Sequence, residues 1–191
     1  MAPSSEYAKP TAADLRAAYG KTIPDVLAPG LSVVFCGINP GLYSAATGCH
    51  FARPGNRFWP ALYRSGFTPR PMLPQEQFDL LAYKLGVTNL VDRGSARAEE
   101  LSPAELSEGG RRLARKMRRL RPQWLAVLGV GAYRTAFAER AAVIGAQART
   151  IGPTRIWVLP NPSGLNAHYT LDRLVEQFAD LRRAVIDRSV S

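Results

Sequence analysis

The sequence of 191 residues contains only two cysteines and two histidines. Two cysteines cannot build a disulfide framework or supply the four thiolates of an iron–sulfur cluster. The spacing of Cys36, Cys49, His50 and His168 matches no zinc-binding pattern, so we expect no metal and no cofactor. No apolar run approaches the roughly 20 residues that a membrane-spanning helix needs, and the first residues lack a hydrophobic signal core. We therefore expect a cytoplasmic protein without a membrane partner.

Acidic residues are scarce relative to basic ones. The chain has 25 Lys and Arg against 15 Asp and Glu, which gives a formal net charge of +10. A basic surface of this size favours a polyanionic partner, nucleic acid first and an anionic membrane surface second. Because arginine dominates, the excess can also reflect genomic base composition alone. Charge therefore indicates nucleic acid without establishing it.

Short apolar segments alternate with helical patterns along the chain. Strands are expected at residues 31–36, 87–92, 124–129 and 155–159. Helices are expected at residues 12–19, 58–65, 78–85, 103–120, 132–142 and 171–181, and a loop at 43–58. Strands without polar alternation are typical of a mainly parallel sheet that is covered on both faces. The sequence thus predicts one α/β domain at 23–188, with three α/β/α layers and about four strands, after a partly ordered extension at 1–22.

Two of the predicted strands run directly into an Asn-Pro pair. VVFCGI is followed by Asn39 and RIWVLP by Asn161. Ligands of open α/β sheets bind beyond the carboxyl ends of the strands, so we expect the two asparagines to share one site. An amide donates and accepts hydrogen bonds but takes no proton at neutral pH, so it can orient water or read the edge of a flat polar group. The alternative is that each amide only satisfies backbone groups of its turn.

Three loops add to this site hypothesis. Phe51 lies among Gly, Ala and Pro residues, where it can either stack on a planar base or fold back onto the domain. Leu165 is the one large apolar residue of SGLNAH, and proteins that open a duplex insert such a wedge. LGVGAY resembles part of a Gly-rich phosphate loop but lacks its spacing and its Lys. We interpret LGVGAY as a strand-to-helix turn, with nucleotide binding as an alternative.

The stretches GINPGLYSAATG, ARPGNRFW and PNPSGLN, in this order, resemble the mismatch-specific uracil-DNA glycosylases, the group related to thymine-DNA glycosylase. The resemblance runs over residues 24–186 and includes GVTNLVDR. It implies an enzyme that flips uracil, thymine or a damaged pyrimidine out of mismatched double-stranded DNA, notably from G·U pairs. Hydrolysis of the N-glycosidic bond would leave an abasic site, without a metal. We expect the protein to act as a monomer.

The resemblance also implies roles for individual residues. Asn39 would orient the attacking water. The base pocket would be lined by Ile38, Gly41, Ser44, Phe51 and Asn161. The wedge that faces the widowed guanine would consist of Ser163, Gly164, Leu165 and Asn166. Phosphate contacts are expected from Arg53, Arg57 and His168, which flank the motif loops.

The sequence departs from its relatives at several positions. Related uracil glycosylases have Asp and His where this chain has Asn39 and Asn161, which implies weaker chemical assistance and greater reliance on poorly paired bases. Ala167 stands where family members often have Arg, which would weaken recognition of the opposite guanine. Asn89 stands where a close relative has Lys, which removes one possible phosphate contact.

Asp92 is a second candidate catalytic residue. It ends a motif-bearing strand and, unlike Asn39, can act as a general base if its loop lies near the pocket. The alternative is that Asp92 pairs with Arg93 or Arg97 or caps the turn that follows.

Two further expectations stay open. The arginines between 111 and 119 fall on more than one helix face, so part of that helix must be solvated and we assign it no DNA contact. A non-catalytic module that binds DNA lesions or mismatches is the alternative function, because a site made only of asparagines can hold a base without releasing it.

Overall fold

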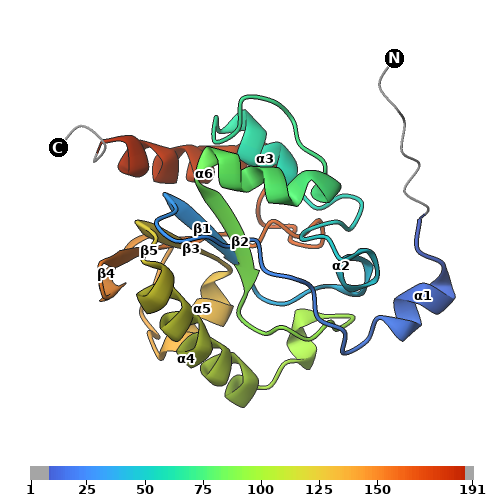
Figure 1. Ribbon diagram of the computed structural model, residues 1–191. Helices are drawn as coiled ribbons and strands as arrows, with labels where there is room; N and C mark the ends of the chain where they lie inside the picture. The colour runs from blue at the N-terminus through green and yellow to red at the C-terminus, as the bar shows by residue number, and fades with distance from the viewer. Residues whose placement is uncertain (1–8, 188–191) are drawn as a thin grey trace.

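The computed structural model describes residues 9–187, which are arranged around a five-stranded sheet (Figure 1). Its strands are β1 (Val33–Gly37), β2 (Leu85–Asn89), β3 (Trp124–Leu128), β4 (Gly145–Ile151) and β5 (Thr154–Leu159). They lie in the order β2-β1-β3-β5-β4, and all neighbours are parallel except β4, which runs antiparallel to β5. Residues 1–8 of the predicted extension and residue 188 of the predicted domain lie outside the described residues.

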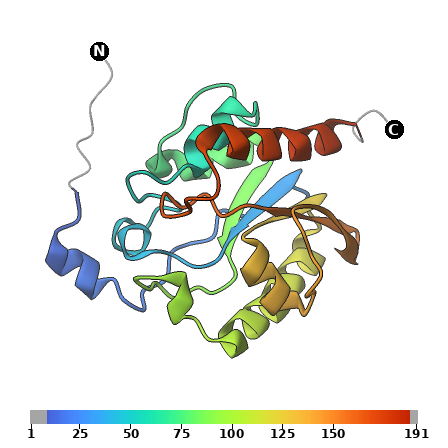
Figure 2. The same cartoon turned by 180° about the vertical axis from the view of Figure 1, so that it is seen from behind.

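Helices cover both faces of the sheet (Figures 1 and 2). One face is covered by α3 (Phe58–Arg64), α6 (Leu171–Ile186) and the 3-10 helix η1 (Pro74–Tyr83), and the other by α4 (Pro103–Leu120) and α5 (Val130–Phe137). Phe35 of β1 points into the first of these cores and Val34 into the second, as the pleat of a strand requires. The predicted α/β fold, with three layers and a mainly parallel sheet, is confirmed.

Three short helices complete the described chain. They are α1 (Ala12–Ala17), α2 (Leu42–Thr47) and the 3-10 helix η2 (Ala98–Glu100). The predicted start of α4 is confirmed, because Ser102 and Glu105 form a capping box in front of Pro103. Within residues 9–187, we find no helix that combines the length and the apolar character needed to span a membrane.

The structure corrects several of the sequence-based expectations. The predicted strand at 87–92 is β2, which ends at Asn89, and the predicted helix at 132–142 is α5, which ends at Phe137 because Ala138 adopts a left-handed φ of 56°.

A fifth strand, β4, was not expected, because this largely exposed edge strand is polar and contains an irregularity in its pairing with β5. The predicted loop at 43–58 contains α2, whose small residues give little periodic signal. The predicted helix at 78–85 is the end of η1, and Leu85 and Gly86 belong to β2. Gly86 is required there because a Cβ would lie 2.6 Å from the carbonyl oxygen of Val26.

The close packing of α4 on α5 depends on Gly110. A Cβ at this position would lie 2.4 Å from the carbonyl oxygen of Ala136. We expect Gly110→Ala to lower the free energy of unfolding by about 1–3 kcal/mol, because the backbone must shift. This loss should outweigh the gain of up to about 1 kcal/mol that Ala brings to a helix interior. Urea denaturation of the variant measures the difference.

Gly131 in α5 provides the matched control for this substitution. A Cβ there would have no neighbour within 4 Å, so Gly131→Ala should leave stability unchanged or slightly raise it. Equal urea midpoints for the two variants would show that the contact with Ala136 does not limit the approach of the helices.

Candidate active site

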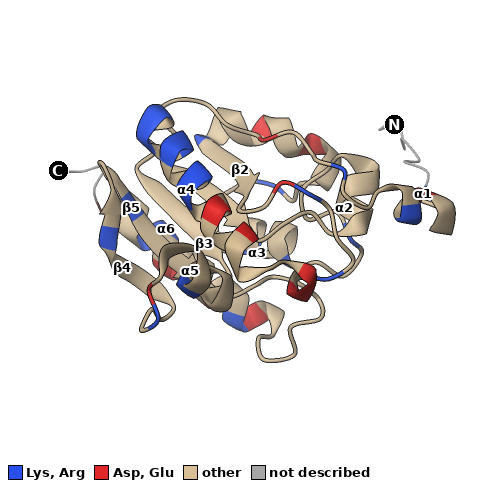
Figure 3. Ribbon diagram, turned by 90° about the horizontal axis from the view of Figure 1, so that it is seen from below, with Lys and Arg blue, Asp and Glu red and all other residues tan. Residues whose placement is uncertain are grey.

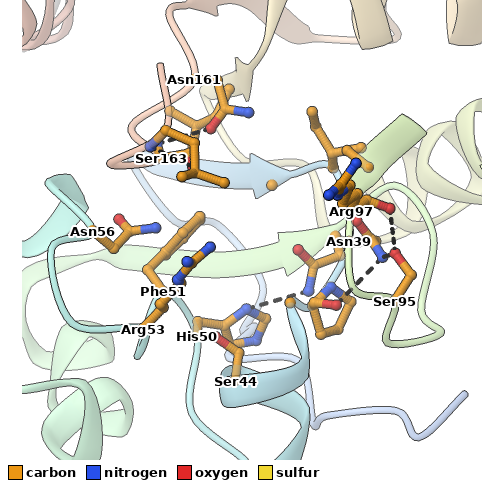
Figure 4. Close-up of a pocket in the computed structure, with 18 of the residues that line it drawn as sticks. Asn39, Ser44, His50, Phe51, Arg53, Asn56, Ser95, Arg97, Asn161 and Ser163 are labelled. Atoms are coloured by element: carbon orange, nitrogen blue, oxygen red, sulfur yellow. Dashed lines mark hydrogen bonds between the residues drawn. The ribbon is translucent and has the colours of Figure 1, made fainter. Parts of the chain in front are cut away.

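A cavity of about 490 Å³ opens at the carboxyl ends of the strands (Figure 4). Its walls come mainly from residues 37–56, 89–99 and 161–166, segments that are far apart in the sequence. The predicted site residues that line it are Ile38, Asn39, Gly41, Ser44, Phe51, Arg53, Asn161, Ser163, Leu165 and Asn166. Those that do not line it are Arg57, Asp92, Gly164 and His168. The structure therefore brings the two Asn-Pro turns to one site, as their positions at strand ends predict.

The amide of Asn39 is held in one orientation by the loop after β2. Its Nδ2 donates to the carbonyl oxygen of Arg93 at 3.0 Å, to Oγ of Ser95 at 2.8 Å and to the carbonyl oxygen of Pro40 at 3.3 Å. The hydroxyl of Ser95 donates in turn to the carbonyl oxygen of Arg97 at 2.7 Å (Figure 4). No group within 9–187 donates to Oδ1 of Asn39, so this oxygen is left as an acceptor for a ligand in the cavity.

Asn89 and His50 form a second polar pair at the cavity. His50 Nε2 lies 2.9 Å from the carbonyl oxygen of Pro24, an acceptor, so Nε2 carries the proton and Nδ1 accepts from Asn89 Nδ2 at 3.4 Å. Burial lowers the pKa of His50, so its imidazole is neutral at neutral pH. Asn89 is 6% exposed, and its Oδ1 has no donor among the residues that the structure describes. The pair thus presents one amide oxygen to the cavity.

Gly37, the last residue of β1, makes room for this arrangement. A Cβ at Gly37 would lie 2.6 Å from Oδ1 of Asn89 and 3.2 Å from Cζ of Phe51. From the sequence, Asn89 stands out only as the absence of a Lys, and no motif there places His50 in the pocket. One signal was available for Asn89, because it is a third asparagine at a strand end.

Phe51 folds back onto the domain, the second of its two predicted alternatives, and its stacking on a base stays a prediction. Its ring folds back and stacks on Phe58, with the ring centroids 4.1 Å apart and the planes 27° apart. It is half-buried and still lines the cavity. The backbone of Phe51 has φ of 54°, a left-handed conformation that a bulky residue rarely adopts and that turns the ring toward Phe58. An aromatic surface backed by a second ring is thus available to a flat ligand.

The loop after β5 supplies the opposite wall. The Oδ1 of Asn161 accepts from the backbone N of Ser163 at 3.0 Å, while its Nδ2 finds no acceptor within the described chain. Gly164 packs on the neighbouring loop, because a Cβ there would lie 2.7 Å from the carbonyl oxygen of Gly55. Leu165 is 71% exposed and lines the cavity mouth. This wall therefore offers one amide donor and one protruding apolar side chain.

Arg57 does not line the cavity but binds the backbone of the loop after β5. Its guanidinium donates to backbone carbonyl oxygens of the loop, those of Pro162, Ser163, Asn166 and Tyr169. Because these bonds occupy most of its donors, Arg57 fixes the loop after β5, and the expected phosphate contact finds no support in its placement.

The cations at the cavity rim are Arg53 and Arg97. Both are exposed, and the side chain of neither has a partner within residues 9–187. Arg97, which the sequence suggests only as a partner for Asp92, lines the cavity instead. His168 is also exposed but does not line the cavity. Free guanidinium groups at a rim are suited to bind phosphate.

Asp92 lies outside the cavity. Its carboxylate pairs with Arg112 of α4 at 3.2 Å and is 41% exposed. Arg93, one of its two expected partners, pairs with Glu105 instead. The loop therefore does not bring Asp92 near the pocket, the condition on which its catalytic role depended.

A metal site and a nucleotide site each need specific groups close together. Between residues 9 and 187, no three His, Cys, Asp or Glu side chains gather closely enough to hold a metal ion. Burial in β1 raises the pKa of the Cys36 thiol, which keeps it protonated. Gly129, with φ of 141°, directly precedes α5 and does not line the cavity. LGVGAY is thus the predicted strand-to-helix turn.

Known proteins resemble this chain in sequence and in fold. The family model of the uracil DNA glycosylase superfamily matches residues 24–184, which include the three segments that form most of the cavity wall. Among solved structures, the fold is similar to the solution NMR structure of a candidate uracil DNA glycosylase from Methanosarcina acetivorans. The TM-score is 0.57 at 18% identity, over 86% of this chain and 97% of that one. With a family model that spans most of its length, the chain belongs to the uracil DNA glycosylase superfamily.

Proposed function

We propose that the protein is a monofunctional DNA glycosylase that removes uracil, thymine or a damaged pyrimidine from mismatched duplex DNA, notably from G·U pairs. The observation that carries the proposal is the orientation of Asn39. Its amide nitrogen donates hydrogen bonds to the carbonyl oxygen of Arg93 and to Oγ of Ser95, which leaves the amide oxygen as an acceptor in the cavity. An oxygen in this position can hold a water molecule against the sugar of a flipped nucleotide.

The reaction needs few groups from the protein. The bond between C1′ of the sugar and the base nitrogen breaks, and its electron pair leaves with the base. The sugar then carries oxocarbenium-like charge, which the dipole of Asn39 and the neighbouring phosphates stabilise. The water held on Oδ1 adds its oxygen to C1′ and gives up a proton, and the departing base takes a proton from solvent. The products are a free base and an abasic site.

The cavity can also read a pyrimidine edge. Oδ1 of Asn89 is an acceptor that suits the N3–H of uracil or thymine, whereas cytosine has no hydrogen on N3. Nδ2 of Asn161 is a donor that suits a base carbonyl. The ring of Phe51 provides a stacking surface. These three groups come from different segments and support binding of a flipped base.

A preference for mismatched pairs follows from the weakness of the catalytic groups. Asn39 carries no charge, and His50 is kept neutral by burial, so no imidazolium assists the departing base. A poorly paired base costs less to extrude, because unpairing and unstacking account for a few kcal/mol. Mismatched pairs are then the substrates that a modest catalyst can process, with Arg53 and Arg97 binding the phosphates at the rim.

The activity can be tested with end-labelled duplexes that contain G·U, A·U, G·T or only normal pairs, followed by alkaline cleavage of abasic sites. We expect strand scission at G·U above A·U and none at normal pairs. Tight binding to the mismatched duplexes without scission would instead indicate the alternative, a non-catalytic module that binds lesions.

Ser95 is expected to act through Asn39. Ser95→Ala removes one of the acceptors that orient the amide, so the single-turnover rate of base release should fall about tenfold, the equivalent of one hydrogen bond. Duplex affinity should stay within about twofold, because Ser95 is only 1% exposed and presents little surface to the duplex. Ser65→Ala, which removes another buried hydroxyl bound to a carbonyl in α3, is the control and should leave the rate unchanged. Equal rates for both variants would contradict the role of Ser95.

A further inference from the structure

A second cavity, of about 450 Å³, lies between α4 and α5 and shares no lining residue with the candidate active site. We call it the arginine groove, after the four arginines that line it: Arg111, Arg115 and Arg118 of α4, and Arg149 of β4. Figure 3 shows basic residues gathered along α4 on the face of the molecule that α4 and α5 form. The proposed glycosylase mechanism makes no use of this surface.

The groove has a defined geometry. Arg111, Arg115 and Arg118 are spaced at i, i+4 and i+7, so they share one face of α4. α4 and α5 approach closely at Gly110, so small residues of the two helices line the groove together with the longer arginine side chains. Across the groove, Arg149 donates to the carbonyl oxygen of Phe137 at 3.0 Å and lies over its ring, 5.3 Å from the centroid. Arginines on two different elements therefore face the same space.

The groove carries more positive than negative charge. Glu108 pairs with Arg111 at 2.8 Å and with Arg115 at 3.5 Å, and Glu139 pairs with Arg149 at 3.1 Å. Arg118 has no acidic partner in the part of the chain that the structure describes. Four guanidinium groups thus face two carboxylates, and these exposed ion pairs are weak enough to be exchanged for another anion.

We propose that the arginine groove binds the phosphodiester backbone of a DNA segment, separate from the segment whose base enters the active site. Phosphate oxygens need only guanidinium donors, and a row of arginines contacts a backbone without reading its sequence. The inference goes beyond the proposed glycosylase activity, because it concerns undamaged DNA and requires no base release.

The groove lies away from the active-site cavity. The helix α4 begins a few residues after Glu99, which lines the active-site cavity. Arg111 and Arg118 lie about 12 Å and 22 Å along the helix from its first residue, at 1.5 Å per residue. The three arginines therefore lead away from the cavity along the side of the molecule. A protein that holds a second segment in this way can remain on DNA while the active site is empty.

A nucleic acid fits the groove better than an acidic polypeptide does. Protein partners are usually anchored by large apolar side chains in pockets. Within the described chain, none of the exposed large apolar residues lines the groove, and Phe137 is only 6% exposed beneath Arg149. The groove thus offers charge and donors with little apolar surface.

The test compares two variants that each remove two exposed positive charges. Arg115→Gln/Arg118→Gln changes the groove, and Arg70→Gln/Arg183→Gln changes distant parts of the surface that do not line either cavity. Fluorescence anisotropy measures binding of an undamaged duplex between about 50 and 200 mM salt. We expect the groove variant to lose about tenfold in affinity at low salt and its salt slope to fall by about two, because two phosphate contacts are lost. The control should change by less than about twofold.

Several outcomes would overturn the proposal. Equal losses in both variants would show a general effect of net charge, and unchanged affinity in the groove variant would show that no DNA binds there. Loss of polyglutamate binding with unchanged DNA affinity would assign the groove to an acidic polypeptide. Base release from G·U duplexes at saturating enzyme should be the same in the groove variant and in the unmodified protein. If the unmodified protein releases no base but binds DNA through the groove, the glycosylase proposal fails and the groove proposal stands.

Discussion

Asn39→Ala is expected to lower the single-turnover rate of uracil release from a G·U duplex by about 10²–10³-fold, the usual effect of removing one positioned catalytic group. The substitution removes the oxygen that we propose holds the attacking water, and it leaves the cavity walls at Phe51 and Asn161 in place. Duplex affinity should therefore stay within about tenfold, which corresponds to about 1.4 kcal/mol. Rapid quenching with alkali measures the rate, and anisotropy measures the affinity.

Asp92→Asn is the control for this experiment. Its carboxylate pairs with Arg112 outside the cavity, so the variant should retain the full rate within about twofold. A large loss in Asp92→Asn together with a small loss in Asn39→Ala would restore Asp92 as the catalytic residue. If both variants lose equally little, the cavity holds the base without an essential role for either side chain.

Leu165→Ala is expected to slow base release from duplex DNA by about 10- to 100-fold, because filling the space of an extruded base offsets a few kcal/mol of unstacking. Single-stranded DNA needs no such wedge, so release from it should change by less than about twofold. Leu165 is 71% exposed, so thermal stability should not change. The measured quantity is the ratio of the two release rates.

Leu73→Ala is the matched control, since Leu73 is also exposed, at 65%, but lies in front of η1 and lines neither cavity. It should leave the ratio of duplex to single-strand rates as it is. Equal losses of Leu165→Ala on both substrates would show that Leu165 shapes the pocket and does not open the duplex.

The strands that carry the site could be predicted from the sequence, whereas the edge of the sheet could not. β1 and β3 are buried between two helical layers and are apolar along their length, and β5 is apolar from Ile156 onward, so all three are visible as continuous runs. β4 pairs on one side only and exposes much of its length, so its residues are not constrained to be apolar. Its polar composition therefore resembles that of a loop.

Residues of the candidate site could be predicted from the sequence where they directly follow the end of a strand. Asn39 and Asn161 are of this kind, because the turn that follows each strand places them at the cavity. Ser95 and His50 form hydrogen bonds with partners that lie 56 and 39 residues away in the sequence, and no local sequence pattern shows such pairs. The same limit applies to Asp92, whose partner on α4 became known only from the packing of that helix.

The contacts of Arg57 also bear on the order in which the candidate site can assemble as the chain is synthesised. Arg57 precedes the carbonyl groups that it binds by 105 to 112 residues. During synthesis, Asn39 and Phe51 leave the ribosome early, but their cavity lacks its opposite wall until residues 161–166 have emerged. A growing chain therefore carries only part of the cavity wall. The candidate site can form only after segments 105 to 112 residues apart have met, so the pairing of Arg57 with the loop after β5 must precede any binding in the cavity.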